Sequence, residues 1–267
     1  MPQIDGPRNS EYCMKDNTVV DIASIRTTCQ SCGLYQLCLP MGLNDGDMEK
    51  LDTVIKRRRK IERGDHLFRM REAFSMVYAI RSGSVKTYAT IENGQEQVTG
   101  FHLPGELLGL NAVSTRFHTD SAIALETTSV CEIPFERLEN LSGEIPGLSH
   151  HLLHVMSEEI QHDHCQLMMI SKMPAEARLA KFLLSLSNHF DQRGFSATEF
   201  NLSMSRNDIA NLLGLAVETV SRLFTHFHEE GLLTVERKHV VLHDIDGLMD
   251  VTTKCASYPL PNQYPRK

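Results

Sequence analysis

The chain has 267 residues, seven cysteines and a formal net charge of −7, and its length allows two domains with separate hydrophobic cores. It contains no run of about 18 apolar residues and no apolar segment near its start, which argues against a membrane span and a signal peptide. The acidic charge excludes a protein that coats nucleic acid regardless of sequence, because such binding depends on clustered Lys and Arg. We therefore expect a cytoplasmic protein in a reducing compartment, where disulfides are rare.

Near the start of the chain, Cys29, Cys32 and Cys38 form a C-x2-C-x5-C cluster. Thiolates are soft ligands that suit zinc or an iron–sulfur cluster, and three so close in sequence can surround one centre without long-range folding. The alternative is that they are incidental thiols. Three further cysteines without a close partner in sequence are expected to be free thiols: Cys13, Cys165 and Cys255.

Residues 64–134 contain short apolar or alternating stretches separated by glycines. This spacing predicts the strands of an antiparallel β roll or barrel, and Asn93-Gly94 between two of the stretches predicts a hairpin turn. The basic run that precedes them, Lys56–Lys60, is expected to be a solvated face, as most charge runs are.

From Pro146 to about Lys172 the apolar spacing becomes helical, and Pro146 suits the first turn of a helix. Spacings that alternate between three and four residues predict a coiled-coil seam that pairs with a second copy of the chain, with one acidic member. The alternative is an amphipathic helix packed on its own domain. The predicted dimer residues are Leu153, Met156, Ile160, Asp163, Leu167 and Ile170.

Pro174 separates this helix from an amphipathic segment, residues 177–190, where a second domain is expected to begin. Further along, Ser205 can cap a short helix, Gly214 can open a tight turn, and a second helix runs from about Val217. This order of helix, glycine-containing turn and helix is the pattern of a DNA-binding helix-turn-helix.

On the second helix of this pattern, Val220, Leu223 and Phe227 follow core spacing, which leaves polar side chains on the outer face. Such side chains read base edges, since Arg pairs with guanine, Glu accepts from the cytosine amino group, and Ser adapts to either. The alternative is that the Glu and the Arg, four residues apart, merely pair on a solvated helix. The DNA-reading candidates are Glu218, Ser221 and Arg222.

Residues 232–244 predict a β hairpin that follows the two helices. Arg237 and Lys238 fall at its turn, where a wing would contact phosphates.

The stretches CQSCGLYQLC, YAIRSGSVKTY, QVTGFHLPGELLG, LETTSVCEIPFERL and VETVSRLF resemble the catabolite activator, or CRP/FNR, family of transcription factors, and within it the oxygen-sensing FNR group. The resemblance covers about residues 29–245. It implies an oxygen-responsive regulator that activates or represses transcription and holds a [4Fe-4S] cluster. It further implies a homodimer that binds palindromic TTGAT-type sites and contacts RNA polymerase.

The same resemblance implies that Cys131 is the fourth cluster ligand, beside Cys29, Cys32 and Cys38. The residues alone do not single out Cys131, because a lone cysteine on a strand is more often a small buried hydrophobe.

One departure from the wider family concerns the effector. Cyclic-nucleotide readers of this fold place an Arg beside a Ser, after a GE-x-x-G turn, to pair with the cyclic phosphate. Here residues 105–109 supply the turn, but the pair reads Asp120-Ser121. Because an aspartate repels a phosphate where Arg would bind it, cyclic AMP is not expected to be the effector.

We therefore predict an α+β protein with an N-terminal antiparallel β roll of the cyclic-nucleotide-binding type, a long dimerisation helix and a C-terminal winged helix-turn-helix. The expected divisions are a variable segment 1–28, a cysteine leader and roll 29–144, the dimerisation helix 145–172, the DNA-binding domain 173–246 and a flexible tail 247–267.

Two rival functions keep the same DNA-binding half: a zinc-stabilised regulator, and a repressor that uses the roll as a small-molecule pocket. An enzyme is not expected, because the sequence shows no carboxylate pair, Ser/His elbow or phosphate loop. His150 and His151 are expected to be solvated rather than catalytic.

Overall fold

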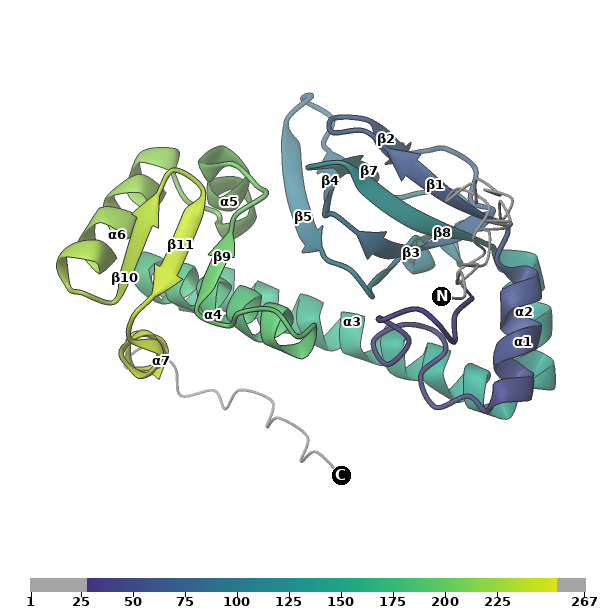
Figure 1. Cartoon of the computed structure of the whole chain (residues 1–267). Coiled ribbons are helices and arrows are strands. Elements are labelled where there is room, and N and C mark those ends of the chain that lie inside the picture. Colours follow the sequence, from purple (N-terminus) through teal and green to yellow (C-terminus); the bar gives the residue numbers. More distant parts are fainter. Residues whose placement is uncertain (1–27, 254–267) are drawn as a thin grey trace, which may run out of the picture.

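The computed structural model describes residues 28–253. An antiparallel β roll lies over the first part of a long helix, and a helix-turn-helix domain lies beyond the roll near the end of that helix (Figure 1). The predicted fold class is therefore confirmed. The variable segment up to residue 27, Cys13 and Cys255 lie outside the described residues.

The roll consists of two four-stranded antiparallel sheets with strand orders β1-β8-β3-β6 and β2-β7-β4-β5. Strands β4 and β5 form the hairpin predicted at Asn93-Gly94, where Gly94 has a φ of 81°. A short 3-10 helix, η2 (Leu110–Ala112), follows β6. The eight strands are β1 (Arg57–Ile61), β2 (His66–Phe68), β3 (Met76–Ser82), β4 (Val85–Thr90), β5 (Glu96–His102), β6 (Leu107–Leu108), β7 (Ser121–Ala124) and β8 (Thr128–Pro134).

Side chains alternate between two cores along the central strands β3 and β8. Ile80 and Val130 point into the roll interior, whereas Val77 and Ile133 face a second core outside the sheet. Because side chains of a strand alternate with a period of two, Cys131 shares the outer face with Ile133. Residues of this outer face, among them Cys131 and Ile133, line the cavity that contains the leader cysteines.

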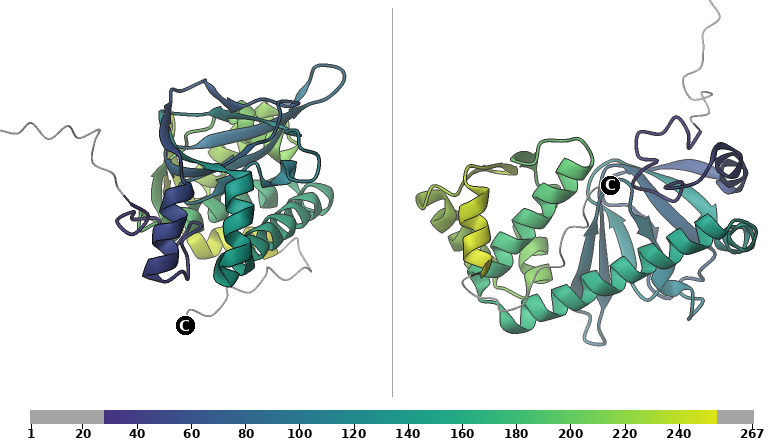
Figure 2. Two further views of the ribbon diagram at one scale, coloured as in Figure 1. Left: turned by 90° about the vertical axis from the view of Figure 1, so that its right-hand side faces the viewer. Right: turned by 90° about the horizontal axis from the view of Figure 1, so that it is seen from below.

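Helices α1 (Asp45–Val54) and α2 (Phe135–Glu144) stand side by side against the outer core (Figure 2). The long helix α3 (Pro146–Lys172) begins with Pro146 in its first turn, as predicted, and passes beneath the strands of the roll (Figure 2). Among the helices of residues 28–253, none combines the length and apolar character that crossing a bilayer requires.

The C-terminal domain contains two core helices, the two helices of the reading motif and a three-stranded sheet of order β10-β11-β9. The prediction of a flexible tail from residue 247 is wrong for residues 247–253, because they belong to a helix whose Leu248 is completely buried against the domain core. The elements are α4 (Ala175–Gln192), β9 (Glu199–Asn201), α5 (Arg206–Leu213), α6 (Val217–Glu229), β10 (Leu233–Glu236), β11 (His239–Leu242) and α7 (Ile245–Thr253).

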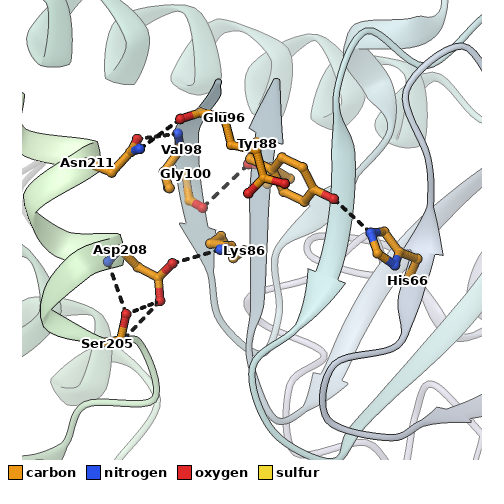
Figure 3. A network of polar contacts seen from close by, with 10 residues as sticks. His66, Lys86, Tyr88, Glu96, Val98, Gly100, Ser205, Asp208 and Asn211 are labelled. Carbon is orange, nitrogen blue, oxygen red and sulfur yellow. Dashed lines mark hydrogen bonds and ion pairs between the residues drawn. The ribbon is translucent and has the colours of Figure 1, made fainter. Parts of the chain in front are cut away.

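The two domains of the chain are joined along β5, an edge strand of the roll (Figure 3). Asn211 of α5 donates to the Glu96 carbonyl at 2.8 Å and accepts from the Val98 N–H at 2.6 Å, so its amide satisfies the open strand edge. Beside it, Lys86 of β4 and Asp208 of α5 form an ion pair at 2.7 Å, with both side chains 15% exposed. The first helix of the reading motif is therefore tied to the roll.

A second joint lies at the end of α4. Arg193 donates to the Glu106 carboxylate at 2.9 Å and to the Pro104 carbonyl at 2.5 Å, and its side chain is only 4% exposed. Burial opposes ionisation of Glu106, but the hydrogen bond with His102 and the charges of His189 and Arg193 lower its pKa. Glu106, the glutamate of the GE-x-x-G turn, thus binds the C-terminal domain through Arg193.

Candidate metal centre and nucleic-acid interface

The structure brings the four predicted ligand cysteines to one cavity. Cys29, Cys32 and Cys38 come from the leader, residues 28–44, and Cys131 comes from β8. The leader reaches the sheet through a series of turns, one of which is closed by a bond from the Cys32 N–H to the Cys29 carbonyl at 3.1 Å. Opposite Cys131, strand β3 supplies Ala79, whose small side chain also lines the cavity.

The rest of the cavity wall is mainly apolar and belongs to the leader, the sheet and Ile55 at the end of α1. Burial raises the pKa of Cys38 to about 12. Burial, followed by a hydrogen bond to Asp52, also raises the pKa of Cys29 well above its ordinary value. Both thiols are therefore protonated at neutral pH, and a metal centre bound there displaces their protons.

The donor set fits a soft metal centre. Four sulfur donors on one apolar cavity suit an iron–sulfur cluster or a zinc ion, both of which bind thiolates in sets of four. Within residues 28–253, no group of three or more His, Cys, Asp or Glu side chains is already arranged around a single point for a metal ion.

The leader also rests on the long helix. Leu39 and Leu148 of α3 are buried in the same core, with Leu152 packed against it. The expectation that His151 is solvated is wrong, because it is 9% exposed. Burial lowers the pKa of His151, and a hydrogen bond to the backbone of Cys38 partly opposes that effect. The cysteine site and the first half of α3 are thus in direct contact.

Farther along α3, the predicted dimer residues lie on an open face. The apolar members Leu153, Ile160 and Leu167 are 65%, 56% and 65% exposed, and Met156 is 39% exposed. Asp163 is exposed in the same row. Ile170 differs from the others, because it is half-buried and its Cγ2 lies 3.5 Å from the point where a side chain added at Gly214 of the reading motif would begin.

The reading motif forms as predicted. Ser205 caps α5 and is paired with Asp208 in a capping box, so that two backbone N–H groups are satisfied. Gly214 ends α5 with a φ of 63°, a left-handed conformation that glycine adopts without strain. Buried residues of α6 include Val220 and Phe227, as expected from their spacing.

The three DNA-reading candidates, Glu218, Ser221 and Arg222, are exposed on the face of α6 opposite its buried residues. Strands β10 and β11 form the predicted wing hairpin, with Arg237 and Lys238 at its turn. A helix with exposed polar side chains beside a basic wing is an arrangement that can enter a major groove and contact the flanking phosphates.

The Asp120-Ser121 pair is buried in the roll. Asp120 is 8% exposed and accepts from the Asn111 amide at 3.3 Å, and burial raises its pKa. Nearby, His118 stacks on Phe68 with ring centroids 3.8 Å apart. The protein's own side chains therefore pack where cyclic-nucleotide readers place their phosphate-binding pair.

Sequence reasoning missed two residues of these sites. Asp52 contacts Cys29, but a single acid on a short helix gives no signal that links it to the leader. Arg206, at the first position of α5, lies over the Phe224 ring at 3.3 Å, and burial lowers its pKa to about 10. Phe224 is a buried residue of α6, and no periodicity in the sequence identifies the cation above it.

Two family models match the chain. The model described as a cyclic nucleotide-binding domain matches residues 58–144, and the model described as a Crp-like helix-turn-helix domain matches residues 177–251. The second match includes most of α7, in agreement with its buried position.

Named relatives cover most of the chain. It is 51% identical over 220 residues to the transcriptional activator protein FnrA of Stutzerimonas stutzeri, with 82% of this chain and 90% of FnrA covered. It is 46% identical over 220 residues to the fumarate and nitrate reduction regulatory protein of Escherichia coli K12, with 82% and 88% covered. The solved structure of FixK2 from Bradyrhizobium japonicum is similar with a TM-score of 0.67 and 29% identity, over 73% of this chain and 96% of FixK2.

Proposed function

The chain belongs to the CRP/FNR family of transcription regulators, and is a DNA-binding protein rather than an enzyme; from that membership we propose that it senses oxygen through a [4Fe-4S] cluster. The proposed ligands are Cys29, Cys32, Cys38 and Cys131. The loaded protein is a cytoplasmic homodimer that binds palindromic TTGAT-type sites, contacts RNA polymerase and controls genes of anaerobic metabolism.

The observation that carries the proposal is the single cavity lined by all four cysteines. Three of its thiols come from a leader that contains no helix or strand within residues 28–44, and the fourth comes from a central strand of the roll. A centre bound by all four would therefore fasten the leader to the sheet. When bound, a [4Fe-4S] cluster supplies an oxygen-sensitive set of Fe–S bonds.

The contact between the leader and α3 supports a route from the cysteine site to dimerisation. In the first half of α3, His151 forms a hydrogen bond with the backbone of Cys38, and Leu148 lies in the same core as Leu39 of the leader. Fixing the leader also fixes this packing surface. Because a ligand shifts an equilibrium only by its differential affinity, the cluster must bind more tightly to the dimer-competent arrangement of α3.

The open face of α3 supports the homodimer. Leu153, Ile160 and Leu167 form an exposed apolar row that the rest of this chain leaves uncovered within the described range. Apolar rows with this spacing pair with a second helix. Asp163 opposes the pairing, because two copies would bring like charges together near the dimer axis. The dimer is therefore poised, and a modest change in packing can form or dissolve it.

The exposed face of α6 supports sequence-specific DNA binding. We assign base reading to Glu218, Ser221 and Arg222, and phosphate contact to Lys238 in the wing. A symmetric pair of such helices reads a palindrome, since the two-fold axis of the protein is matched by that of the site.

The buried carboxylate of Asp120 argues for a cluster rather than cyclic AMP as the effector. It lies where a cyclic-nucleotide reader presents a cation, and a phosphate brought there would meet an acid. The roll therefore keeps the architecture of a nucleotide-binding domain without the charge that such binding requires.

Anaerobic purification of the full chain tests the proposal. We expect a coloured protein with about four iron and four sulfide per chain, whose visible absorption bleaches in air. A zinc-stabilised regulator would be colourless and contain zinc. A small-molecule regulator would contain neither metal, and its oligomeric state would not respond to air. Either result would contradict the proposal.

A further inference from the structure

A carboxylate contacts the backbone of Cys29, the first of the four cysteines in the chain. The Cys29 N–H points at the side chain of Asp52 on α1, 2.9 Å from Oδ1 and 3.1 Å from Oδ2. These residues are 23 positions apart in the chain, so the contact fixes the start of the leader to a distant helix.

The position of Asp52 on α1 is unfavourable for a helix by itself. Asp52 lies in the last turn, where the negative end of the helix dipole repels a carboxylate, and that turn contains no basic residue to offset the repulsion. An acid is therefore not explained by the stability of α1. The bonds to the Cys29 N–H give it a different role.

Helix α1 is a firm support for such a role. Its buried face consists of Met48, Leu51 and Val54, and Leu51 is completely buried in the core that also contains Leu39 of the leader. Asn44 caps the helix by accepting from the Asp47 N–H at 2.9 Å. The leader, in contrast, is built from turns, so a contact to α1 limits where Cys29 can lie.

We propose that Asp52 is the positioning residue for the Cys29 ligand: its carboxylate holds the Cys29 backbone so that the thiol faces the cavity before the metal centre is assembled. The importance of this hold for cluster assembly rests on the proposed function, whereas the anchoring itself does not. Ligand sites that are held in place before binding lose less freedom on binding, and their supporting contacts affect affinity for that reason.

Three variants of the full chain separate the anchoring from other effects of the acid. Asp52→Ala removes the acceptor. Asp52→Asn keeps an oxygen acceptor for the Cys29 N–H but removes the charge. Glu49→Ala is the matched control, because Glu49 is an exposed acid on the same helix and carries no contact to a cysteine in the described structure.

Two measurements are made on each variant. The first is hydrogen exchange of the Cys29 amide in protein without metal, which we expect to become about tenfold faster or more in Asp52→Ala, because that variant removes both oxygens that accept from the amide. The second is the affinity for iron and sulfide, measured by anaerobic reconstitution with limiting iron. We expect this affinity to fall at least about tenfold in Asp52→Ala. Asp52→Asn should keep slow exchange of the Cys29 amide and should lose no iron affinity, because it keeps an acceptor and removes the acid that raises the Cys29 pKa. Glu49→Ala should remain close to the parent protein in both measurements.

The inference is overturned if Asp52→Ala exchanges and binds iron like the parent, or if Asp52→Asn loses as much as Asp52→Ala. A parent chain that assembles no cluster at all would contradict the proposed function instead. In that case the exchange of the Cys29 amide still decides whether Asp52 anchors the leader.

Discussion

The reading motif and the cysteine site are built in opposite ways. The reading motif is continuous in sequence: Ser205, Asp208 and Gly214 fix one helix and its turn through contacts three or four residues apart. The cysteine site is formed by a leader, a helix and a central strand. Its fourth thiol comes from β8, the last strand of the roll in the sequence. A local motif forms when its own residues favour the same structure, whereas the cysteine site exists only when the roll has folded.

This difference also separates the two functions. The reading motif presents exposed polar side chains from a capped and buried scaffold, so its own fold does not depend on a bound centre. The cysteine site is completed by a leader of turns, which makes it the part of the molecule whose shape a bound centre can change. We expect changes at the cysteine site to act on assembly, and changes on α6 to act on sequence preference.

The largest expected effect is the loss of the metal centre in Cys131→Ser. A hydroxyl is a poor ligand for iron, so the variant should lose the stable cluster as fully as Cys29→Ser, Cys32→Ser or Cys38→Ser. Iron and sulfide analysis after anaerobic reconstitution is the measurement. Cys13→Ser is the control and should bind normally; the reverse pattern would show that the ligand set is wrongly assigned.

The next effect concerns the acid on the open face of α3. Asp163→Ala removes the repulsion between two like charges, so the variant should dimerise and bind the palindrome in air without a cluster. We expect its dimer dissociation constant in air to fall at least tenfold, equivalent to about 1.4 kcal/mol. Sedimentation of the air-exposed variant tests this. If the variant is a monomer at concentrations where the anaerobic parent is a dimer, Asp163 does not control dimerisation.

On α6, Arg222→Ala should weaken binding to the cognate half-site by about 1–3 kcal/mol and relax the preference at one guanine. Lys238→Ala in the wing should weaken binding to all sequences alike and reduce the salt dependence, because a phosphate contact is lost. Titrations with cognate and scrambled DNA at several salt concentrations distinguish them. Equal losses on both DNAs for Arg222→Ala would contradict direct base reading.

The smallest expected effect lies at the joint between the two regions. Burial opposes ionisation of Asp208, but Lys86 and Ser205 lower its pKa below the ordinary 3.8. The ion pair therefore stabilises the fold above that value and loses its contribution as the pH falls through the folded pKa. Lys86→Ala should lower the free energy of unfolding by about 1 kcal/mol at neutral pH.

Asp208→Ala should cost about 1 kcal/mol more than Lys86→Ala, because it also removes the capping box of α5. Urea denaturation at neutral and acidic pH provides the comparison. If the deficit of Lys86→Ala is unchanged well below pH 3.8, the ion pair does not stabilise the joint.

The same contrast explains how much of the molecule could be predicted from sequence. The cap at Ser205, the turn at Gly214 and the wing hairpin follow from residue types with strong local preferences, and all three are confirmed. The row on α3 is readable because its period of 3.5 residues extends over several turns. In each case the signal lies within a few residues of its effect.

Elements that depend on distant partners were missed. Strand β1 overlaps the basic run expected to be solvated, and the charges of an edge strand hide its pairing with β8. Helix α1 has a weak apolar pattern, and its place is set by the core that it shares with the leader. The sequence predicts a flexible tail in place of helix α7 because the end of the chain is rich in Pro and polar residues, although Ile245, Leu248 and Met249 follow helical spacing.

For the cysteine site, sequence physics supplies the three leader thiols but not the fourth. Cys131 was identified by resemblance, and its place next to the leader follows from the register of β8 with β3. No local pattern predicts the contact between Asp52 and Cys29, because it depends on how α1 packs on the roll.

The central claim is that a centre held by the four cysteines controls pairing along α3. Sedimentation velocity of the anaerobic protein tests it most directly. The run is followed simultaneously in the ultraviolet and at the visible absorption of the cluster. After partial exposure to air, we predict that the coloured fraction sediments as a dimer and the colourless fraction as a monomer. A coloured monomer, or a colourless dimer at the same concentration, would contradict the account.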